Sequence, residues 1–210
     1  MNTYLITPTL IQSWQYWYNY DGDKEEEVKS SFLATLKREK TPTNEAMQAG
    51  INFEKQVIQC SYDKPWTCNE VMACSGNNCI LDIAQIIENG MFQVALKKEI
   101  KVADTNFLLY GKADVIKQDT IFDIKYTTNA DNYNIGKYSN SVQHLLYMFC
   151  AELNKFQYII SDGDTYWLED YNVSNIQIHT ALLDKIYNFY SFIQNNQELL
   201  TIFQDKWIAQ

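Results

Sequence analysis

Two carboxylates and one ammonium group come close together in GKADVIKQDTIFDIKYT, the sequence of residues 111–127. They belong to Asp114, Asp123 and Lys125. Carboxylate oxygens are the ligands that hard divalent cations prefer, and a bound cation beside a lysine is suited to hydrolysis of a phosphodiester. This chemistry requires the three side chains to share one face, so it depends on the elements that carry them.

The alternation of apolar and polar residues predicts two strands, at about 107–117 and 120–127, joined by a two-residue turn at Gln118–Asp119. In that register Asp114 lies directly opposite Asp123, with Cβ atoms about 4.5–5.5 Å apart. Like charges this close repel, so a plain surface hairpin should avoid them. A divalent cation bridging the two carboxylates would replace this repulsion by attraction of both to the ion.

Lys125 follows Asp123 by two residues, so it points to the same face roughly 7 Å along the strand. The opposite face is predicted to be core and carries Ala113, Val115, Phe122 and Ile124. The alternative to a metal site is a solvated strand face with incidental charges.

A third carboxylate, Glu54, lies in a helix predicted at about 44–60, between Ile51 and Ile58 on its apolar stripe. A carboxylate there must be paired, bound to metal or at the edge of the stripe. The alternative is an edge glutamate whose head reaches water.

Gln143 and Tyr147 are four residues apart and share one face of a helix predicted at 141–152. They are candidates for substrate contact, or simply the polar flank of a packed helix. For His144 we expect a surface or capping role, which disfavours a metal site built on histidine. Lys112 would sit across from Lys125, where it could steer a phosphate or be solvated charge.

The remaining pattern predicts a mixed α/β domain. Helices are expected at 8–20, 24–40, 80–88 and 175–205, with a possible break at Asn195–Asn196. Further strands are expected at 92–102, 156–161 and 165–171. Residues 61–79 and 128–140 are expected to be irregular.

Composition limits the class of protein. The 210 residues suffice for one domain, and no apolar run approaches the ~20 residues that span a bilayer. The first residues lack the features of a signal peptide, so we expect a soluble, cytoplasmic protein with reduced thiols. The absence of a C-x-x-C pair among Cys60, Cys68, Cys74 and Cys79 disfavours a structural zinc site.

Charge argues against a nonspecific nucleic-acid binder. The chain has 26 acidic and 17 basic residues, for a formal net charge of −9. Nucleic-acid binders usually show a basic footprint, although a local basic groove and bound metal ions can serve an acidic protein. A second class of function therefore stays open.

Four motifs occur in order along the chain: G-x-x-F-E at 50–54, G-x-x-D at 111–114, D-x-K at 123–125 and Q-x-x-x-Y at 143–147. Together they resemble the PD-(D/E)XK nuclease superfamily, and their order and spacing are most similar to its RecB-like and lambda-exonuclease-like branch. D-x-K alone is a weak motif, whereas four motifs in order are more specific. The resemblance covers about residues 44–150 and the strand that follows.

The resemblance implies a restriction-endonuclease-like core, with a central mixed sheet of about five strands flanked by helices. Residues 44–171 would form this core, 1–43 an N-terminal helical extension and 172–210 C-terminal helices, all in one domain.

It also implies roles for single residues. Glu54, Asp114 and Asp123, with the Ile124 carbonyl, would hold one or two Mg²⁺ or Mn²⁺ ions. Lys125 would orient or help deprotonate the attacking water. Gln143 and Tyr147 would contact DNA or that water.

The expected function is that of a Mg²⁺-dependent deoxyribonuclease, more exonuclease than endonuclease, of the kind found in phage or prophage recombination or repair. Its expected partner is DNA, with a possible protein partner in a recombination or repair complex. The alternative is a catalytically silent nuclease-fold protein that binds a protein through its acidic surface, as an inhibitor or DNA mimic.

Overall fold

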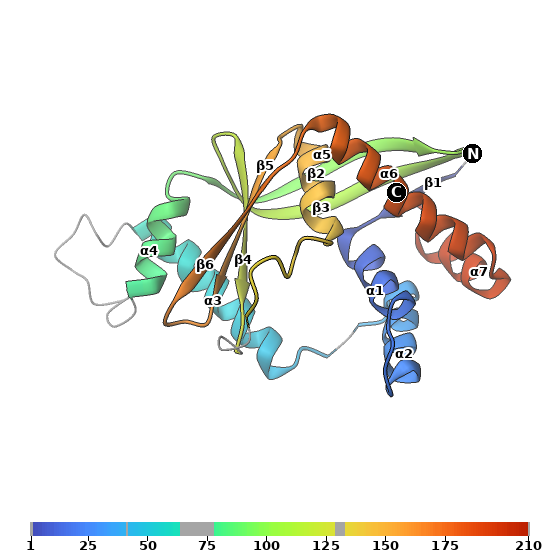
Figure 1. Cartoon of the computed structure of the whole chain (residues 1–210), viewed down its shortest axis with the longest axis horizontal. Coiled ribbons are helices and arrows are strands. Elements are labelled where there is room, and N and C mark those ends of the chain that lie inside the picture. Colours follow the sequence, from blue (N-terminus) through green and yellow to red (C-terminus); the bar gives the residue numbers. More distant parts are fainter. Residues whose placement is uncertain (1, 41, 64–77, 129–132, 210) are drawn as a thin grey trace.

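The computed structural model describes residues 2–40, 42–63, 78–128 and 133–209. In these residues a six-stranded mixed sheet is flanked by seven helices, which is the arrangement expected of a restriction-endonuclease-like core (Figure 1). The strands are β1 (Thr3–Ile6), β2 (Met91–Val102), β3 (Thr105–Lys117), β4 (Thr120–Tyr126), β5 (Lys155–Ser161) and β6 (Tyr166–Asn172). The helices are α1 (Pro8–Tyr18), α2 (Glu25–Leu36), α3 (Glu45–Asp63), α4 (Asn78–Ile87), α5 (Val142–Ala151), α6 (Asn175–Gln194) and α7 (Gln197–Lys206).

Strand β3 organises the sheet because it has different partners on its two edges. One edge pairs antiparallel with β2 along nearly its whole length. The other edge pairs in parallel with β1 at residues 106–109 and antiparallel with β4 at residues 115–117. Residues 110–114 lie in the gap between these two partners. The sequence motif G-x-x-D falls in this gap.

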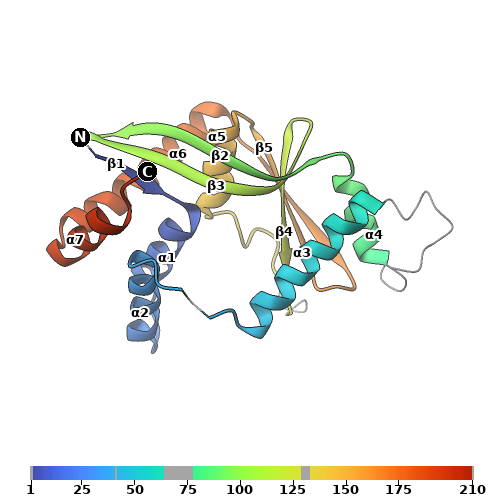
Figure 2. The ribbon, with the colours of Figure 1, turned by 180° about the vertical axis from the view of Figure 1, so that it is seen from behind.

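The core has two parts, which pack against different regions of the sheet. The large cluster joins residues of α1, α2, α5, α6 and α7 to the sheet, and the small cluster joins α3 and α4 to β3, β4 and β5. Figures 1 and 2 show α3 and α4 at one end of the molecule and α1, α2 and α7 at the other.

Capping side chains explain where several helices begin. The Thr7 hydroxyl accepts a hydrogen bond from the Leu10 amide, and proline follows at the first helical position of α1. Ser141 caps α5 in the same way, and Ser174 starts α6 with a capping box. Asn196 caps α7, so the expected break at Asn195–Asn196 is confirmed.

The structure corrects several boundaries. The turn at Gln118–Asp119 is confirmed, and Lys117 pairs with Thr120. Strand β1 was missed, because four residues are too short for a periodic pattern. Helix α3 continues to Asp63, beyond the expected end at residue 60. Most of the segment predicted as irregular, 61–79, lies outside the described residues.

Two further features bear on the class of protein. Among the described residues, none of the helices combines the length and apolar character that crossing a bilayer requires. The expectation of reduced thiols is wrong for Cys60, which is disulfide-bonded, and holds for Cys150.

Candidate functional site

Asp114 lies where β3 and β4 separate. The antiparallel ladder ends at Val115 and Phe122, so the expected pairing of Asp114 directly opposite Asp123 does not form. Instead, the Ile124 amide donates a hydrogen bond of 2.9 Å to Asp114 Oδ2. The carboxylate therefore satisfies a backbone donor that the diverging ladder leaves open.

The direction of the β3 side chains also changes at Asp114. Leu109 and Ala113 lie in the large cluster, whereas Val115 lies in the small one. Strict alternation would place all three on one face. The prediction that Ala113 and Val115 are core is confirmed, but they belong to different clusters.

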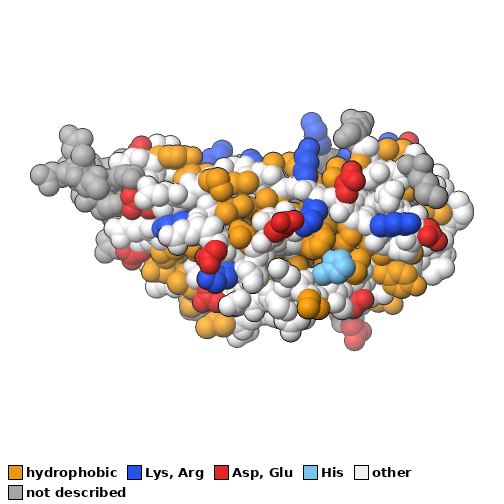
Figure 3. Space-filling view, turned by 90° about the horizontal axis from the view of Figure 1, so that it is seen from above, with side chains coloured by type: hydrophobic (Ala, Val, Ile, Leu, Met, Phe, Trp, Pro, Cys, Tyr) orange, Lys and Arg blue, Asp and Glu red, His pale blue; other side chains and the backbone are white. Residues whose placement is uncertain are grey.

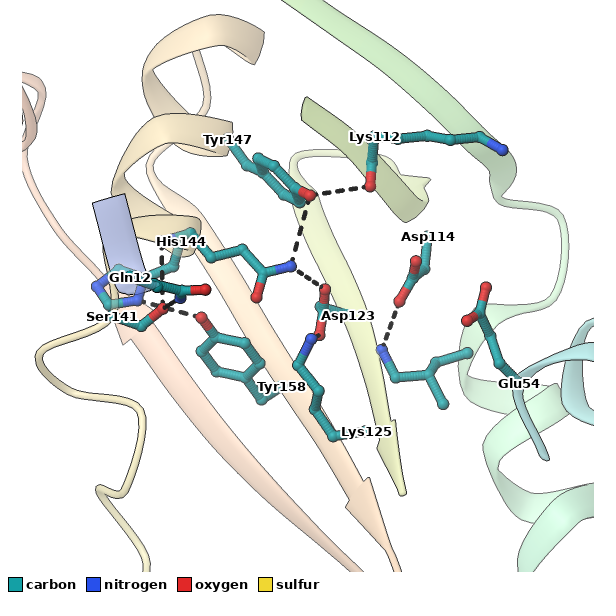
Figure 4. Close-up of polar contacts among 12 residues, drawn as sticks. Gln12, Glu54, Lys112, Asp114, Asp123, Lys125, Ser141, His144, Tyr147 and Tyr158 are labelled. Atoms are coloured by element: carbon teal, nitrogen blue, oxygen red, sulfur yellow. Dashed lines mark hydrogen bonds and ion pairs between the residues drawn. The ribbon is translucent and has the colours of Figure 1, made fainter. Parts of the chain in front are cut away.

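Asp123 is 2% exposed and has two polar partners. Gln143 Nε2 donates a hydrogen bond of 2.6 Å to Asp123 Oδ1, and Lys125 Nζ lies 2.6 Å from Asp123 Oδ2 (Figure 4). Residues 123 and 125 share one face of β4, as expected, and Gln143 reaches them from α5. The D-x-K and Q-x-x-x-Y motifs thus meet in one polar group.

Glu54 comes from α3 and lies beside Asp114 (Figure 4). Gln93 Nε2 donates a hydrogen bond of 2.6 Å to Glu54 Oε1. Gln93 has a positive φ of 54° within β2, a conformation uncommon for residues other than glycine. The strained backbone of Gln93 thus occurs at a residue that contacts the candidate site.

Burial raises the pKa values of all three carboxyls, and repulsion from neighbouring carboxylates adds to it for Asp114 and Glu54. Desolvation is the largest cause in each case. The pKa of Asp114 lies well above its ordinary range, because the charges of Asp123 and then Glu54 add to its burial. The pKa of Glu54 is raised by burial, opposed by the Gln93 hydrogen bond and raised further by Asp123. For Asp123, burial outweighs the stabilisation of its anion by Lys125 and Gln143.

Lys125 is held as an ammonium ion. Burial alone would lower its pKa, but the charge and hydrogen bond of Asp123, followed by the charge of Asp114, raise it above the ordinary value. At neutral pH this side chain is therefore a cation and a hydrogen-bond donor.

Helix α5 is fixed against β3 by a second contact. The Tyr147 hydroxyl donates a hydrogen bond of 3.0 Å to the Lys112 carbonyl. Its ring occupies the space above Gly111, where a Cβ atom would overlap the ring carbons. The glycine of G-x-x-D is therefore required for the close approach of the tyrosine of Q-x-x-x-Y.

A cleft of about 340 Å³ opens in the gap between β1 and β4. Its lining residues are Thr7, Pro8, Thr9, Gln12, Tyr110, Gly111, Lys112, Lys125, Gln143 and Tyr147. The first turn of α1 forms one wall, and the two lysines and α5 form the others. The cations thus line the cleft while Asp123 lies buried behind Lys125.

The structure places all the residues proposed for the site in one region, but the carboxylate oxygens do not converge on a common point. Within the described ranges, no three His, Cys, Asp or Glu side chains are clustered so that they could hold a metal ion. The three carboxylates fit a divalent cation by donor type and by their mutual repulsion. In this structure their oxygens are instead occupied by Gln93, the Ile124 amide, Lys125 and Gln143.

The expected surface role of His144 is wrong. His144 is buried, its ring stacks on Tyr171 at 4.4 Å, and its Nδ1 lies 3.4 Å from the Tyr158 hydroxyl. Desolvation, with a contribution from Lys185, lowers its pKa to about 4. It is a neutral residue that packs against β5 and β6 and does not line the cleft.

Sequence reasoning missed four residues beside the site: Gln93, Gln12, Ser141 and Tyr158. Gln12 Nε2 donates to Ser141 Oγ and so joins α1 to the start of α5. The serine before the apolar run was a detectable capping signal. No sequence signal marks the others, because each acts through a partner distant in the chain.

Comparisons with known proteins indicate only distant likeness. No family model and no curated protein matches the chain. The crystal structure of LHK-Exo in complex with dAMP is similar with a TM-score of 0.48 and 12% identity, covering 90% of this chain and 90% of that one.

Two other crystal structures show the same level of similarity. SSO0001 has a TM-score of 0.46 and 15% identity, covering 89% of this chain and 76% of its own. Rai1 from Scheffersomyces stipitis has a TM-score of 0.39 and 15% identity, covering 93% of this chain and 62% of its own. These values assign no function.

Proposed function

We propose that this chain is a divalent-metal-dependent DNA phosphodiester hydrolase, acting as an exonuclease of the phage or prophage type. One observation carries the proposal. Three carboxyls with raised pKa values, Glu54, Asp114 and Asp123, lie next to a lysine that lines an open cleft. Perturbed carboxyls near a cleft are typical of functional sites, because folding alone gains nothing from their repulsion.

Glu54, Asp114 and Asp123 would hold Mg²⁺ or Mn²⁺, with the Ile124 carbonyl as a further ligand. Such an ion, when bound, stabilises charge on a phosphate and lowers the pKa of a water. The protein's part is to supply the carboxylates, which have to exchange their present hydrogen bonds for the ion. The Ile124 amide and Gln93 are the donors released by that exchange.

The cationic side chains have separate roles. Lys125 orients the attacking water and stabilises developing charge as an ammonium ion. Lys112 attracts a phosphate at the mouth of the cleft. Gln143 and Tyr147 hold Asp123 and the Lys112 backbone in place, and both face the cleft, where they contact the substrate.

A second candidate is a nuclease-fold protein without activity that binds a basic protein partner. The net charge of −9 favours it. Figure 3 shows lysines and arginines scattered among acidic residues over one face of the molecule, rather than gathered in a basic patch. The arrangement at Asp123 and Lys125 favours the enzyme, because a docking surface has no use for a buried acid and a cleft-lining lysine.

The deciding experiment is incubation of the pure protein with end-labelled linear DNA and closed circular DNA, in Mg²⁺, Mn²⁺ or EDTA. We expect linear DNA to be lost from its ends with either metal and to persist in EDTA, while circles survive. Asp114→Asn should abolish the loss. Asp184→Asn, an exposed acid on α6, is the matched control and should cut normally.

Intact DNA after long incubation of folded protein with Mn²⁺ would contradict the enzyme. A basic protein recovered by pull-down, with association that slows sharply as salt is added, would then support the second candidate.

A further inference from the structure

A second hollow adjoins the cleft at Gln12. This second hollow, of about 730 Å³, shares Gln12 with the cleft. We call it the α1 groove, and its lining residues are Gln12, Gln15, Tyr16, Asn19, Tyr20, Asp21, Lys137, Tyr138, Asn140, Ser141 and Lys185. The lining comes from α1 and the residues that follow it, from the segment that leads into α5, and from Lys185 on α6.

The charge of the α1 groove is opposite to that of the molecule. Its lining has two lysines, Lys137 and Lys185, and one acid, Asp21. The chain as a whole has 26 acidic and 17 basic residues. Most of the other lining groups are side-chain amides, hydroxyls and phenols. A polyanion with hydrogen-bonding groups along its length fits this chemistry.

Tyrosine rings are the other distinctive part of the lining. Tyr16 is 63% exposed, and its ring lies 5.8 Å from that of Tyr20 at an angle of 64°. The turn after Tyr20 packs closely against the Tyr20 side chain. A Cβ atom at Gly22 would lie only 2.8 Å from the Tyr20 hydroxyl oxygen. Across the groove, Tyr138 stacks on the buried Tyr158 at 4.6 Å, so its position is fixed.

These features distinguish between two forms of the polyanion. A duplex offers phosphates but hides its base faces in the stack. An unpaired strand offers phosphates for the lysines and base faces for exposed rings. Tyr16 is exposed and Tyr20 is half-buried, and both line the same hollow as the two lysines, next to the cleft.

We propose that the α1 groove binds an unpaired strand of nucleic acid and leads it to the cleft. Bases stack on Tyr16 and Tyr20 while phosphates lie near Lys137 and Lys185. The inference rests on the proposed nuclease function, because that function makes the cleft the place of cleavage. The binding of the strand to the groove is nevertheless measurable without cleavage.

The test measures anisotropy of a fluorescent oligothymidylate in EDTA, where no cleavage is expected. Tyr16→Ala combined with Tyr20→Ala should weaken binding at least about 10-fold, since stacking on aromatic side chains supplies much of such affinity. A duplex of equal length should lose less than about 2-fold. Tyr187→Ala is the matched control, because Tyr187 is 54% exposed on α6 and does not line the groove.

A second variant guards against misfolding of the first. Lys137→Gln should reduce the slope of log affinity against log salt by roughly one contact's share, about 0.7. Lys29→Gln on α2 should leave the slope unchanged. An oligouridylate arm tells whether the groove accepts RNA as well as DNA.

The outcomes separate this inference from the proposed function. Unchanged oligonucleotide affinity in the tyrosine variant, or an equal loss for duplex, overturns the groove even if the protein cleaves DNA. Loss of single-strand binding in a protein that cuts nothing supports the groove and contradicts the nuclease. No binding of any oligonucleotide overturns the inference and leaves the groove to a protein partner.

Discussion

The two hydrophobic clusters support the candidate site to different degrees. Next to the large cluster, the site residues are linked by polar contacts. Gln143 contacts Asp123, which contacts Lys125, and Tyr147 contacts the Lys112 carbonyl. The side of the small cluster contributes Glu54, whose contact is the hydrogen bond from Gln93. Lys112 and Lys125 are therefore held by contacts next to the large cluster, while Glu54 is held by a helix that packs on the small cluster.

This difference suggests how the site responds to a ligand. Among the residues that the structure describes, the small cluster contains nine buried ones, and they include Phe53, Val57, Ile83 and Ile87 from α3 and α4. Fewer buried contacts imply a lower free energy of local opening. We infer that α3, rather than α5, moves when the carboxylates gather around an ion.

The largest expected effect comes from a matched pair of fully buried isoleucines, Ile186 on α6 and Ile83 on α4. Ile186→Ala should lower the free energy of unfolding by about 2–5 kcal/mol, because it leaves a cavity in the large cluster. Ile83→Ala should instead release α3 and α4 locally with a smaller change in the global transition. Hydrogen exchange should show faster amides confined to these helices, and equal global losses would contradict the comparison.

The next effect concerns two Lys–Asp pairs with the same 2.6 Å separation, Lys125–Asp123 and Lys155–Asp119. Lys125→Ala should reduce the cleavage rate at least about 100-fold, since it removes an electrostatic group from the cleft. Lys155→Ala breaks an exposed pair and should leave both the stability and the cleavage rate nearly unchanged.

Arginine in place of Lys125 should not restore full activity, because its planar fork differs from a compact ammonium. Digestion at the wild-type rate by Lys125→Ala would refute the role given to this lysine.

A third effect tests the rigidity of α5 through pH. His144 has a pKa of about 4 in the folded chain, against an ordinary value of 6.5. The stabilisation from keeping it neutral is complete above pH 6.5 and is lost as the pH falls toward 4, by up to about 3 kcal/mol. Urea midpoints at several pH values should show a shallower acid loss for His144→Phe than for His179→Phe, the exposed control. Identical profiles would contradict the assignment.

The smallest effect is expected at Glu54. Its raised pKa means that folding disfavours its anion, so its contribution to stability increases as the pH falls through that pKa. Glu54→Gln keeps an acceptor for Gln93 and should change stability by less than about 1 kcal/mol, in the stabilising direction. It should also remove the rise in Tm that Mg²⁺ or Mn²⁺ gives the wild type. An unchanged rise would exclude Glu54 as a ligand.

Much of the fold could be predicted from the sequence where a pattern is local. The turn at Gln118–Asp119 and the break in the last helical segment at Asn195–Asn196 follow from residue types at those positions, and both are confirmed. The motifs that meet at Asp123 could also be found, because D-x-K and Q-x-x-x-Y each fit one face of one element.

The rest could not be predicted, because it depends on how elements meet. The separation of β3 from β4 at Asp114 follows from the insertion of β1 and α1 beside β3, which no local pattern reports. His144 was misjudged for the same reason, since its burial comes from Tyr171 on β6. Gln93 contacts Glu54 from a residue with a positive φ, and nothing in the sequence indicates that backbone conformation.

Strand β1 has one more consequence, for the solution behaviour of the chain. Its inner edge pairs with β3, and its outer edge is covered by the last described residues: the Leu5 amide donates to the Trp207 carbonyl, and the Ala209 amide donates to the Thr3 carbonyl. Open strand edges are templates for aggregation. Residues 207–209 thus cover an edge of β1 that other chains could otherwise join, so removal of these residues should make the protein more prone to aggregation.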